Sequence, residues 1–458
     1  MENFDTKFVT TCILNVISKK GAHVHFVGVL GAGMLPLARL LVKRGTRVSG
    51  TDRKEPCENH PIRGSGILFT PRHTLDGLDA VDLVVYSLAV PSDNPELLYA
   101  KEHGIPLVTR AQLLGAIVSQ YKISIAVAGT HGKSTTVAII SHILRGCGLS
   151  PTVISGASLS HGDSLLVGGD DIIVVEACEY KNAFHFIRPT IALVTNIDYD
   201  HVDCFDGISA VVDSFLTFVR GAEYTFLNLS CENSGSIAFR EDINTITYGT
   251  VDAEYSLCDY TLVEYKTDFS MKIGGELYRF TIPVAGIGCL YDAVGAIAVS
   301  CRLGVPVSNI CESISTFSGI ERRIQLLGSI GGRPIYYDYA HHPREIENTI
   351  DVLRMRYGEV AVIFRPHTYS RTFAFMNDFV RVLSSASCVT LLDVYAAREN
   401  PTDGSTSMEL AEKLKNATVS TFDAALDYTL SHSNGAIVLM GAGDVDIILS
   451  EIKSKLDN

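Results

Sequence analysis

The sequence predicts an α/β protein of three domains, each with helices packed on a mainly parallel sheet. At 458 residues the chain is too long for a single hydrophobic core. Apolar, β-branched runs alternate with helix-compatible segments along nearly the whole length. Glycine-rich turns follow several of these runs, where doubly wound sheets bind their ligands. We expect a Rossmann-like domain at residues 1–120, a P-loop α/β domain at 121–319 and a second Rossmann-like domain at 320–458.

The composition indicates a soluble, well-packed protein, with 47% hydrophobic and 19% charged residues. No apolar stretch is long enough to span a bilayer, and the run at residues 8–14 has no cleavage site after it. The eleven cysteines are scattered singly, which predicts reduced thiols rather than disulfides or a zinc site. A net charge of −13 argues against a nucleic-acid-binding surface. We expect a cytoplasmic protein that binds neither nucleic acid nor membrane.

The first predicted domain opens with a strand at residues 23–27, a glycine-rich turn, a helix at 35–43 and a second strand ending at Asp52. Glycines let the backbone approach a diphosphate, and an acid at that strand tip can bind a ribose hydroxyl. The spacing is Gly-x-x-Gly-x-Gly, which differs from the NAD fingerprint. We expect a nucleotide-linked ligand and no NAD, with a dinucleotide cofactor or a purely structural turn as alternatives. The expected contacts are Gly31, Ala32, Gly33, Met34 and Asp52.

The most specific motif lies at residues 129–136, between a β-branched run at 123–128 and a helical pattern. Free N–H groups and the positive end of the helix dipole meet an anion at such a turn. Lys133 is expected to reach the β- and γ-phosphates, and the Ser134 hydroxyl to bind Mg²⁺. The loop is shorter than a standard P-loop, since Val127 occupies the usual first glycine position, and an ordinary glycine-rich turn is the alternative. The motif predicts ATP binding by Gly129, Thr130, His131, Gly132, Lys133, Ser134, Thr135 and Thr136.

Polar side chains follow the next two predicted strands. A buried run leads to Glu176, and another leads to Asn196, Asp200 and His201. Acids and an imidazole at neighbouring strand ends, beside a triphosphate, form a natural Mg²⁺ site. The alternative for Glu176 is a capping or ion-paired role. The alternative for His201 is a structural hydrogen bond, and for His201 taken alone this alternative is favoured.

The third predicted domain contains three runs that end in polar or glycine-rich turns, at residues 335–343, 360–372 and 436–444. A single such turn is usually a helix cap or a surface feature. Their repetition at strand ends favours an edge that faces a ligand.

Together these segments resemble the Mur ligase family. The resemblance rests on residues 129–136, 176–180, 195–203, 338–343 and 364–372, and it runs in order from Gly28 to Gly443. It implies a UDP-binding N-terminal domain, a central ATPase domain and a C-terminal domain that closes over the nucleotide. The histidines of the phosphate loop and of the two C-terminal segments favour the branch that adds L-alanine to UDP-N-acetylmuramate in peptidoglycan synthesis.

The reaction implied by the resemblance is ATP-dependent amide formation through an acyl phosphate. One Mg²⁺ is expected at Ser134 and Glu176, and a second at Glu176 and His201. Tyr339 matches the residue that stacks on adenine, and Asp338 one near the ribose.

The resemblance also implies C-terminal groups that contact the reacting anions, the amino acid or the closing domain. These are Arg323, His342, His367 and Arg371. Lys133, Glu176, His201 and Arg371 are the expected catalytic residues, and the expected assembly is a monomer or weak homodimer.

The chain departs from the family pattern at residues 286–292, where these ligases usually carry Gly-x-His-Asn-x-x-Asn. Gly288 and Cys289 replace the His and the first Asn, and Asp292 replaces the second. These positions normally hold adenine and ribose, and Asp292 is carried over as an ATP contact. Two alternatives therefore stay open: a ligase that adds a preformed peptide, Gly or Ser to the same UDP-sugar, and a nucleotide-binding relative with little ligase activity.

Overall fold

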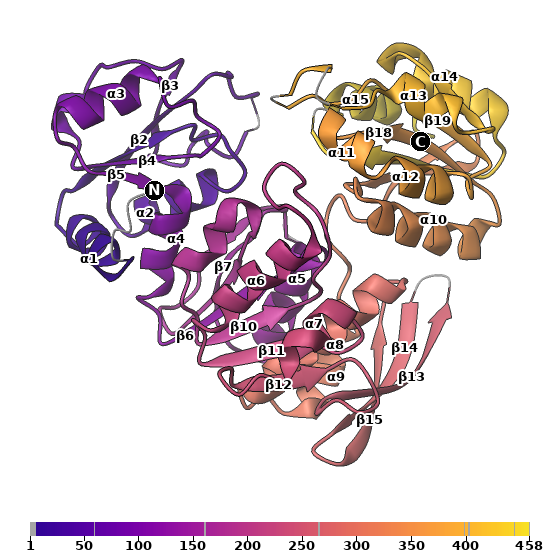
Figure 1. Ribbon diagram of the computed structural model, residues 1–458, viewed down its shortest axis with the longest axis horizontal. Coiled ribbons are helices and arrows are strands. Elements are labelled where there is room, and N and C mark those ends of the chain that lie inside the picture. Colours follow the sequence, from indigo (N-terminus) through magenta and orange to yellow (C-terminus); the bar gives the residue numbers. More distant parts are fainter. Residues whose placement is uncertain are drawn as a thin grey trace. The chain divides into compact units, whose positions relative to one another are not determined.

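The computed structural model describes residues 6–58, 60–159, 162–263, 266–397, 399–401, 404–443 and 445–457. These residues form two compact units, whose elements are labelled in Figure 1. The first unit contains the described residues up to Ile197, with Val212–Glu254 and Gly295–Ile310. The second contains Asp198–Val211, Tyr255–Val294 and the described residues from Cys311 onward.

The N-terminal part of the first unit is a five-stranded parallel sheet with the order β3-β2-β1-β4-β5. Its central strand is buried along its whole length, as the apolar sequence predicts. The strands are β1 (His23–Val27), β2 (Arg47–Asp52), β3 (Leu68–Pro71), β4 (Leu83–Tyr86) and β5 (Leu107–Thr109). The helices are α1 (Thr6–Ile17), α2 (Leu35–Lys43), η1 (Leu78–Ala80), α3 (Pro95–Glu102) and α4 (Arg110–Val118).

The rest of the first unit is built on a seven-stranded sheet with the order β12-β11-β10-β6-β9-β7-β8. Strand β6 (Ile123–Ala128) lies in the middle, between β9 and β10, and only the pairing of β8 with β7 is antiparallel. The other strands are β7 (Thr152–Ile154), β8 (Leu165–Leu166), β9 (Ile172–Glu176), β10 (Ile191–Val194), β11 (Tyr224–Asn228) and β12 (Thr245–Tyr248). The helices of this part are α5 (Lys133–Gly146), η2 (Tyr180–Phe186) and α7 (Glu232–Ala238). Three further helices contribute residues to both units: α6 (Ile208–Val219), α8 (Ile287–Arg302) and α9 (Val307–Ile314).

A three-stranded antiparallel sheet in the second unit has no counterpart among the sequence predictions. Its strands are β13 (Ser256–Val263), β14 (Lys266–Ile273) and β15 (Glu276–Ile282), paired in chain order. The outer strands are largely exposed, while β14 buries Phe269 and Met271. The middle strand is therefore covered better than its two neighbours.

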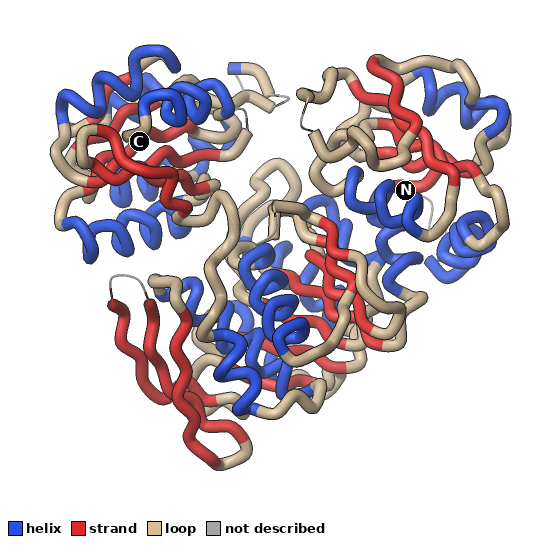
Figure 2. The backbone as a smooth tube through the Cα atoms, turned by 180° about the vertical axis from the view of Figure 1, so that it is seen from behind, coloured by secondary structure: helices blue, strands red, loops and turns tan. Residues whose placement is uncertain are grey.

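The second unit also holds a six-stranded sheet with the order β16-β17-β21-β18-β19-β20, in which only β16 is antiparallel to its neighbour. Helices cover both faces of its strands (Figure 2). The strands are β16 (Gln325–Ile330), β17 (Arg333–Asp338), β18 (Val360–Arg365), β19 (Cys388–Leu391), β20 (Ala417–Val419) and β21 (Ala436–Gly441). The helices are α10 (Pro343–Tyr357), α11 (Tyr369–Ala374), α12 (Met376–Leu383), α13 (Ser407–Glu412), α14 (Phe422–His432) and α15 (Asp446–Lys455).

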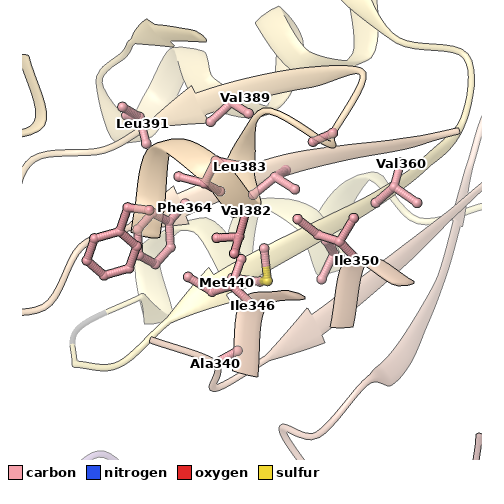
Figure 3. Close-up of a cluster of buried hydrophobic side chains, with 14 of the residues drawn as sticks. Ala340, Ile346, Ile350, Val360, Phe364, Val382, Leu383, Val389, Leu391 and Met440 are labelled. Carbon is pink, nitrogen blue, oxygen red and sulfur yellow. The ribbon is translucent and has the colours of Figure 1, made fainter. Parts of the chain in front are cut away.

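Two apolar cores fix this sheet between its helices. On one face, α10 and α12 pack on the sheet in one buried cluster, in which Figure 3 labels Ile346, Ile350 and Phe364. On the other face, α14 and α15 supply Leu426 and other buried side chains. The sheet is therefore a rigid base for the loops at the carboxyl ends of its strands.

The three helix-flanked sheets confirm the predicted α/β fold class, whereas the domain limits at residues 120 and 319 stay predictions. The apolar run at residues 8–14 is part of helix α1. Among the described helices, none is both long enough and apolar enough to cross a bilayer.

Candidate functional site

The phosphate loop lies at the carboxyl end of β6, the central strand of its sheet. A side chain at Gly129 would place its Cβ 1.9 Å from the Thr195 Oγ1, and the residue has a φ of +146°. Only glycine fits this position, because the end of β10 crosses directly against the loop. The close approach brings the loop and Asn196 together.

Asn196 fixes the shape of the loop through hydrogen bonds. The N–H of His131 donates to its Oδ1 at 2.9 Å, and its Nδ2 donates to the His131 carbonyl at 3.0 Å. The Thr130 N–H donates to the Asn196 carbonyl at 3.2 Å. Asn196 is therefore a loop anchor, a role that the strand-end pattern did not distinguish from metal binding.

The loop leads straight into the first turn of α5. The N–H groups of Lys133, Ser134 and Thr135 have no intrahelical acceptor in this turn, and they share the positive end of the helix dipole. The side chain of Ser134 lies at the same turn and is 9% exposed. This arrangement can hold the phosphates of a nucleotide.

Lys133 turns back over the loop and pairs with Glu179. Its Nζ lies 3.1 and 3.3 Å from the two Glu179 carboxylate oxygens, and it also donates to the carbonyls of Gly129 and Thr130. Burial alone would lower the pKa of Lys133, but the charge and hydrogen bond of Glu179, together with the charges of Cys178 and Glu176, raise it. The amine is thus a fixed positive charge beside the helix N-terminus.

Glu176 ends β9, whose register places it opposite Val127 of β6. Its Oε1 accepts hydrogen bonds from the Ser155 hydroxyl and the Gly156 N–H, both at 2.7 Å. These bonds hold the carboxylate at the strand end next to the phosphate loop. The structure confirms neither the capping nor the ion-paired alternative for this residue.

The predicted diphosphate turn lies between β1 and α2. The Leu30 N–H donates to the Asp52 Oδ2 at 3.0 Å, so Asp52 is held against the turn from the end of β2. Gly31 and Ala32 are exposed, whereas the Met34 side chain is 1% exposed. Met34 therefore belongs to the core, and only its backbone can meet a ligand there.

In the second unit, Arg371 and Asp200 form a buried ion pair. The Arg371 Nη2 and Nε lie 2.6 and 3.0 Å from the Asp200 Oδ1, and the two side chains are 7% and 8% exposed. Burial alone would raise the pKa of Asp200, but Arg371 holds it well below its usual range. The main-chain N–H of His201 also donates to this carboxylate, at 2.7 Å.

Two neutral imidazoles stand beside the Arg371 guanidinium. The Arg371 Nη1 lies 3.1 Å from the His367 Nδ1, and the rings of His367 and His341 are 5.6 Å apart. Burial lowers the pKa of His367 to about 3 and that of His341 to about 4. Both rings are uncharged at neutral pH, so Arg371 carries the positive charge of this cluster.

Asp338, at the end of β17, is an interior hydrogen-bond acceptor. It receives the N–H groups of Ile324 and Ala340 at 2.9 and 2.8 Å and the Thr349 hydroxyl at 3.0 Å. Burial raises its pKa. These bonds fix the turn that presents Tyr339, and a ribose contact of Asp338 stays a prediction.

Tyr339 lies beneath a guanidinium, as the Arg323 Cζ is 5.6 Å from the centre of its ring. Arg323 also lies 3.7 Å from the Glu345 carboxylate. The structure thus brings Arg323 and Tyr339 together at one edge of the six-stranded sheet. Stacking of adenine on Tyr339 stays a prediction.

His342 is the N-cap of α10. Its Nδ1 accepts the Arg344 N–H at 3.4 Å, and its own main-chain N–H donates to the Glu345 carboxylate. The His342 ring lies edge-on to the ring of Phe375, with 4.8 Å between the ring centres. The observed role is structural, and contact with an amino acid stays a prediction.

Asp292 lies on α8 and is 7% exposed. The segment before it packs on α10, where the Gly288 N–H lies 3.4 Å from the Asn348 Oδ1. Contact of Asp292 with ATP stays a prediction.

The predicted residues therefore fall into two sets. The first unit brings together the phosphate loop and Glu176, and separately the diphosphate turn and Asp52. The second unit groups His201, Arg323, Asp338, Tyr339, His342, His367 and Arg371. Sequence reasoning missed Glu179, for which the signal was an acid three residues after Glu176. It expected Asp200 at a Mg²⁺ site and not in an ion pair with Arg371.

Three family models match the chain in order. They are the Mur ligase family catalytic domain at residues 23–122, the Mur ligase middle domain at 127–300 and the Mur ligase glutamate ligase domain at 322–443.

Relatives of similar length carry one name. The UDP-N-acetylmuramate–L-alanine ligase of Lachnospira eligens is 37% identical over 440 residues, covering 92% of this chain and 96% of its own. The ligase of that name from Agathobacter rectalis is 38% identical over 456 residues, covering 95% and 98%.

Solved structures share the fold. The UDP-N-acetylmuramate-alanine ligase of Thermotoga maritima aligns with a TM-score of 0.80 at 24% identity, covering 94% of this chain and 99% of its own. A murein peptide ligase from Psychrobacter arcticus aligns with a TM-score of 0.73 at 21% identity, covering 96% and 100%.

Proposed function

This chain belongs to the Mur ligase family, and from that premise we propose that it joins L-alanine to the lactyl carboxylate of UDP-N-acetylmuramate. ATP is cleaved to ADP and phosphate in the same reaction. The observation that carries the proposal is the phosphate cradle at the start of α5, with Lys133 fixed beside it, in a chain that matches ligases of this name over 92 to 95% of its length.

The chemistry proceeds in two steps. A carboxylate oxygen of the lactyl group attacks the γ-phosphorus, the bond to the β-phosphate oxygen breaks, and ADP leaves. The L-alanine amine then attacks the acyl carbon of the resulting acyl phosphate. Phosphate departs with the former carboxylate oxygen, and the amine nitrogen loses its proton.

The first step brings two anions together, so positive charge must be in place before they meet. The N–H groups of the first α5 turn and the Lys133 ammonium supply it. Lys133 exchanges its Glu179 partner for a phosphate oxygen when ATP binds, since both acceptors are anionic and the amine stays charged.

Mg²⁺ fits the donors present in the first unit. The Ser134 hydroxyl stands in the first turn of α5, and Glu176 is held at the neighbouring strand end through one carboxylate oxygen. Hydroxyl and carboxylate oxygens are the ligands that Mg²⁺ prefers. Ser134 and Glu176 would hold this ion, and His201 is proposed as a ligand of a second Mg²⁺. When bound, Mg²⁺ would neutralise the charge of the phosphates.

The second unit supplies further proposed contacts. Arg371 offers a buried guanidinium to a reacting anion, and the neutral His367 orients it through the bond to Nη1. Tyr339 is the proposed adenine contact. We place the reaction in the cytoplasm, as an early step of peptidoglycan precursor synthesis.

The test is turnover with defined amines. The protein is incubated with ATP, Mg²⁺, UDP-N-acetylmuramate and one of L-alanine, glycine, L-serine or a peptide, and phosphate release and the amide product are measured. L-Alanine should give the highest kcat/KM. Turnover with the peptide and none with L-alanine would favour the peptide-adding alternative, and binding of the UDP-sugar without phosphate release would favour a relative with little ligase activity.

A further inference from the structure

Arg110 lies against the glycine turn between β1 and α2. A Cβ added to Gly33 would meet three atoms of this side chain, Cδ at 3.0 Å, Nη1 at 3.2 Å and Nε at 3.3 Å. Gly33 has no left-handed φ that would require glycine, and a side chain there would have to displace the Arg110 guanidinium slightly. The turn and the arginine are therefore packed as one surface.

The guanidinium has no carboxylate of its own. Among the described residues, none forms a hydrogen bond or ion pair with the Arg110 side chain, although it is half-buried. Half-buried arginines normally have an anionic or carbonyl partner, because desolvation of an unpaired charge is costly.

The position of Arg110 in its helix is also unfavourable by itself. It is the first residue of α4, directly after the N-cap Thr109 and inside the capping box that Thr109 forms with Gln112. The helix dipole favours anions at this end and opposes a cation. An anionic ligand beside the guanidinium would remove that conflict.

Two backbone donors of the glycine turn are available to a ligand. The Ala32 and Gly33 N–H groups donate to no acceptor within the described part of the chain, and Ala32 is exposed. Neighbouring N–H groups of the turn are already used, since Leu30 donates to Asp52 and Met34 to the Gly31 carbonyl. The two available donors thus belong to residues 32 and 33, and Arg110 lies against the second of these.

We propose that Arg110 binds the diphosphate of the UDP-sugar, together with the Ala32 and Gly33 N–H groups. The inference rests on the proposed function and adds a substrate-binding residue to it. A diphosphate suits the site better than a carboxylate, because its several oxygens can accept from the guanidinium and from both N–H groups at once. The strand-to-helix turn of a parallel sheet is also where such a group lies in α/β proteins.

The test separates the phosphate contact from the fold of the turn. UDP and uridine are titrated by calorimetry into the wild-type protein and the variants R110A and R110K. UDP affinity should fall about ten- to a hundredfold in R110A and partly recover in R110K, while the affinity for uridine, which lacks phosphate, stays unchanged. In turnover, R110A should raise KM for the UDP-sugar and leave KM for ATP unchanged.

R44A is the matched control. Arg44 caps the other end of α2 and binds Gln120 and Tyr121, so its loss should leave UDP affinity unchanged. Wild-type UDP affinity in R110A, or an equal loss of uridine binding, would overturn the role of Arg110 and leave the ligase assignment standing. A wild-type protein that binds neither UDP nor UDP-N-acetylmuramate would overturn the proposed function and this inference together.

Discussion

At the scale of single residues, the sequence identifies the groups proposed to contact phosphate but not the groups that hold them in place. Lys133 is proposed because a glycine-rich strand-to-helix turn followed by Lys and Ser has one dominant use. The pairing of Lys133 with Glu179 and the anchoring of the loop by Asn196 are not predictable in this way. Both depend on how neighbouring strands align, which local sequence does not encode.

Removing the Lys133 amine should nearly abolish turnover. In K133A the incoming phosphates lose their fixed cation, so kcat/KM for ATP should fall about a thousandfold or more. Coupled-assay measurement of phosphate release checks this.

K122A is the control for that variant. Lys122 directly precedes β6, the strand that leads into the phosphate loop. It pairs with Asp171 on the surface, where both side chains are more than two-thirds exposed. Its loss should leave kcat/KM within twofold of wild type. Full turnover by K133A would contradict the proposed mechanism.

At the scale of elements, the parallel strands were predictable and the antiparallel sheet was not. Strands such as β6 and β18 are buried on both faces and read as continuous apolar runs. Strands β13 to β15 are half-exposed and carry many polar residues, so their sequence signal is weak. The sheet forms because the three strands meet in register, which the pattern within each strand does not reveal.

The ion pair of Asp200 and Arg371 joins the loop after β10 to helix α11 in the second unit. D200N should lower stability by about 3 kcal/mol at pH 7, because it leaves the Arg371 charge buried and uncompensated. Urea unfolding followed by fluorescence of the tyrosines measures the shift. D206N, at an exposed position of the same loop, should have no effect.

The difference in stability between wild type and D200N should depend on pH in a definite direction. The pKa of Asp200 is lowered in the folded state, so the pair contributes fully above the ordinary aspartate pKa of about 3.9 and is lost as pH falls through the lower folded value. The gap between wild type and D200N should stay constant from about pH 5 to 8 and narrow only in stronger acid. A gap that closes near neutrality would contradict the ion-pair account.

At the scale of the whole molecule, three α/β sheets in order along the chain were predicted and are present. The order of motifs sufficed for this, since each sheet carries its own strand-to-helix signals. The structure adds two facts that the motifs did not contain. The polar groups divide between two compact units, and several residues expected to bind a ligand already form hydrogen bonds that stabilise the fold. His342 and Asp338 are fixed by local hydrogen bonds, which a motif cannot distinguish from ligand contacts.

The central claim is that ATP phosphorylates the lactyl carboxylate before the amide forms. UDP-N-acetylmuramate labelled with ¹⁸O in that carboxylate is turned over with ATP and L-alanine, and the released phosphate is analysed by mass spectrometry. The account predicts that each phosphate carries one oxygen from the carboxylate, because the acyl–oxygen bond breaks when the amine attacks. Phosphate without the label would show that water cleaves ATP and would contradict the acyl-phosphate mechanism.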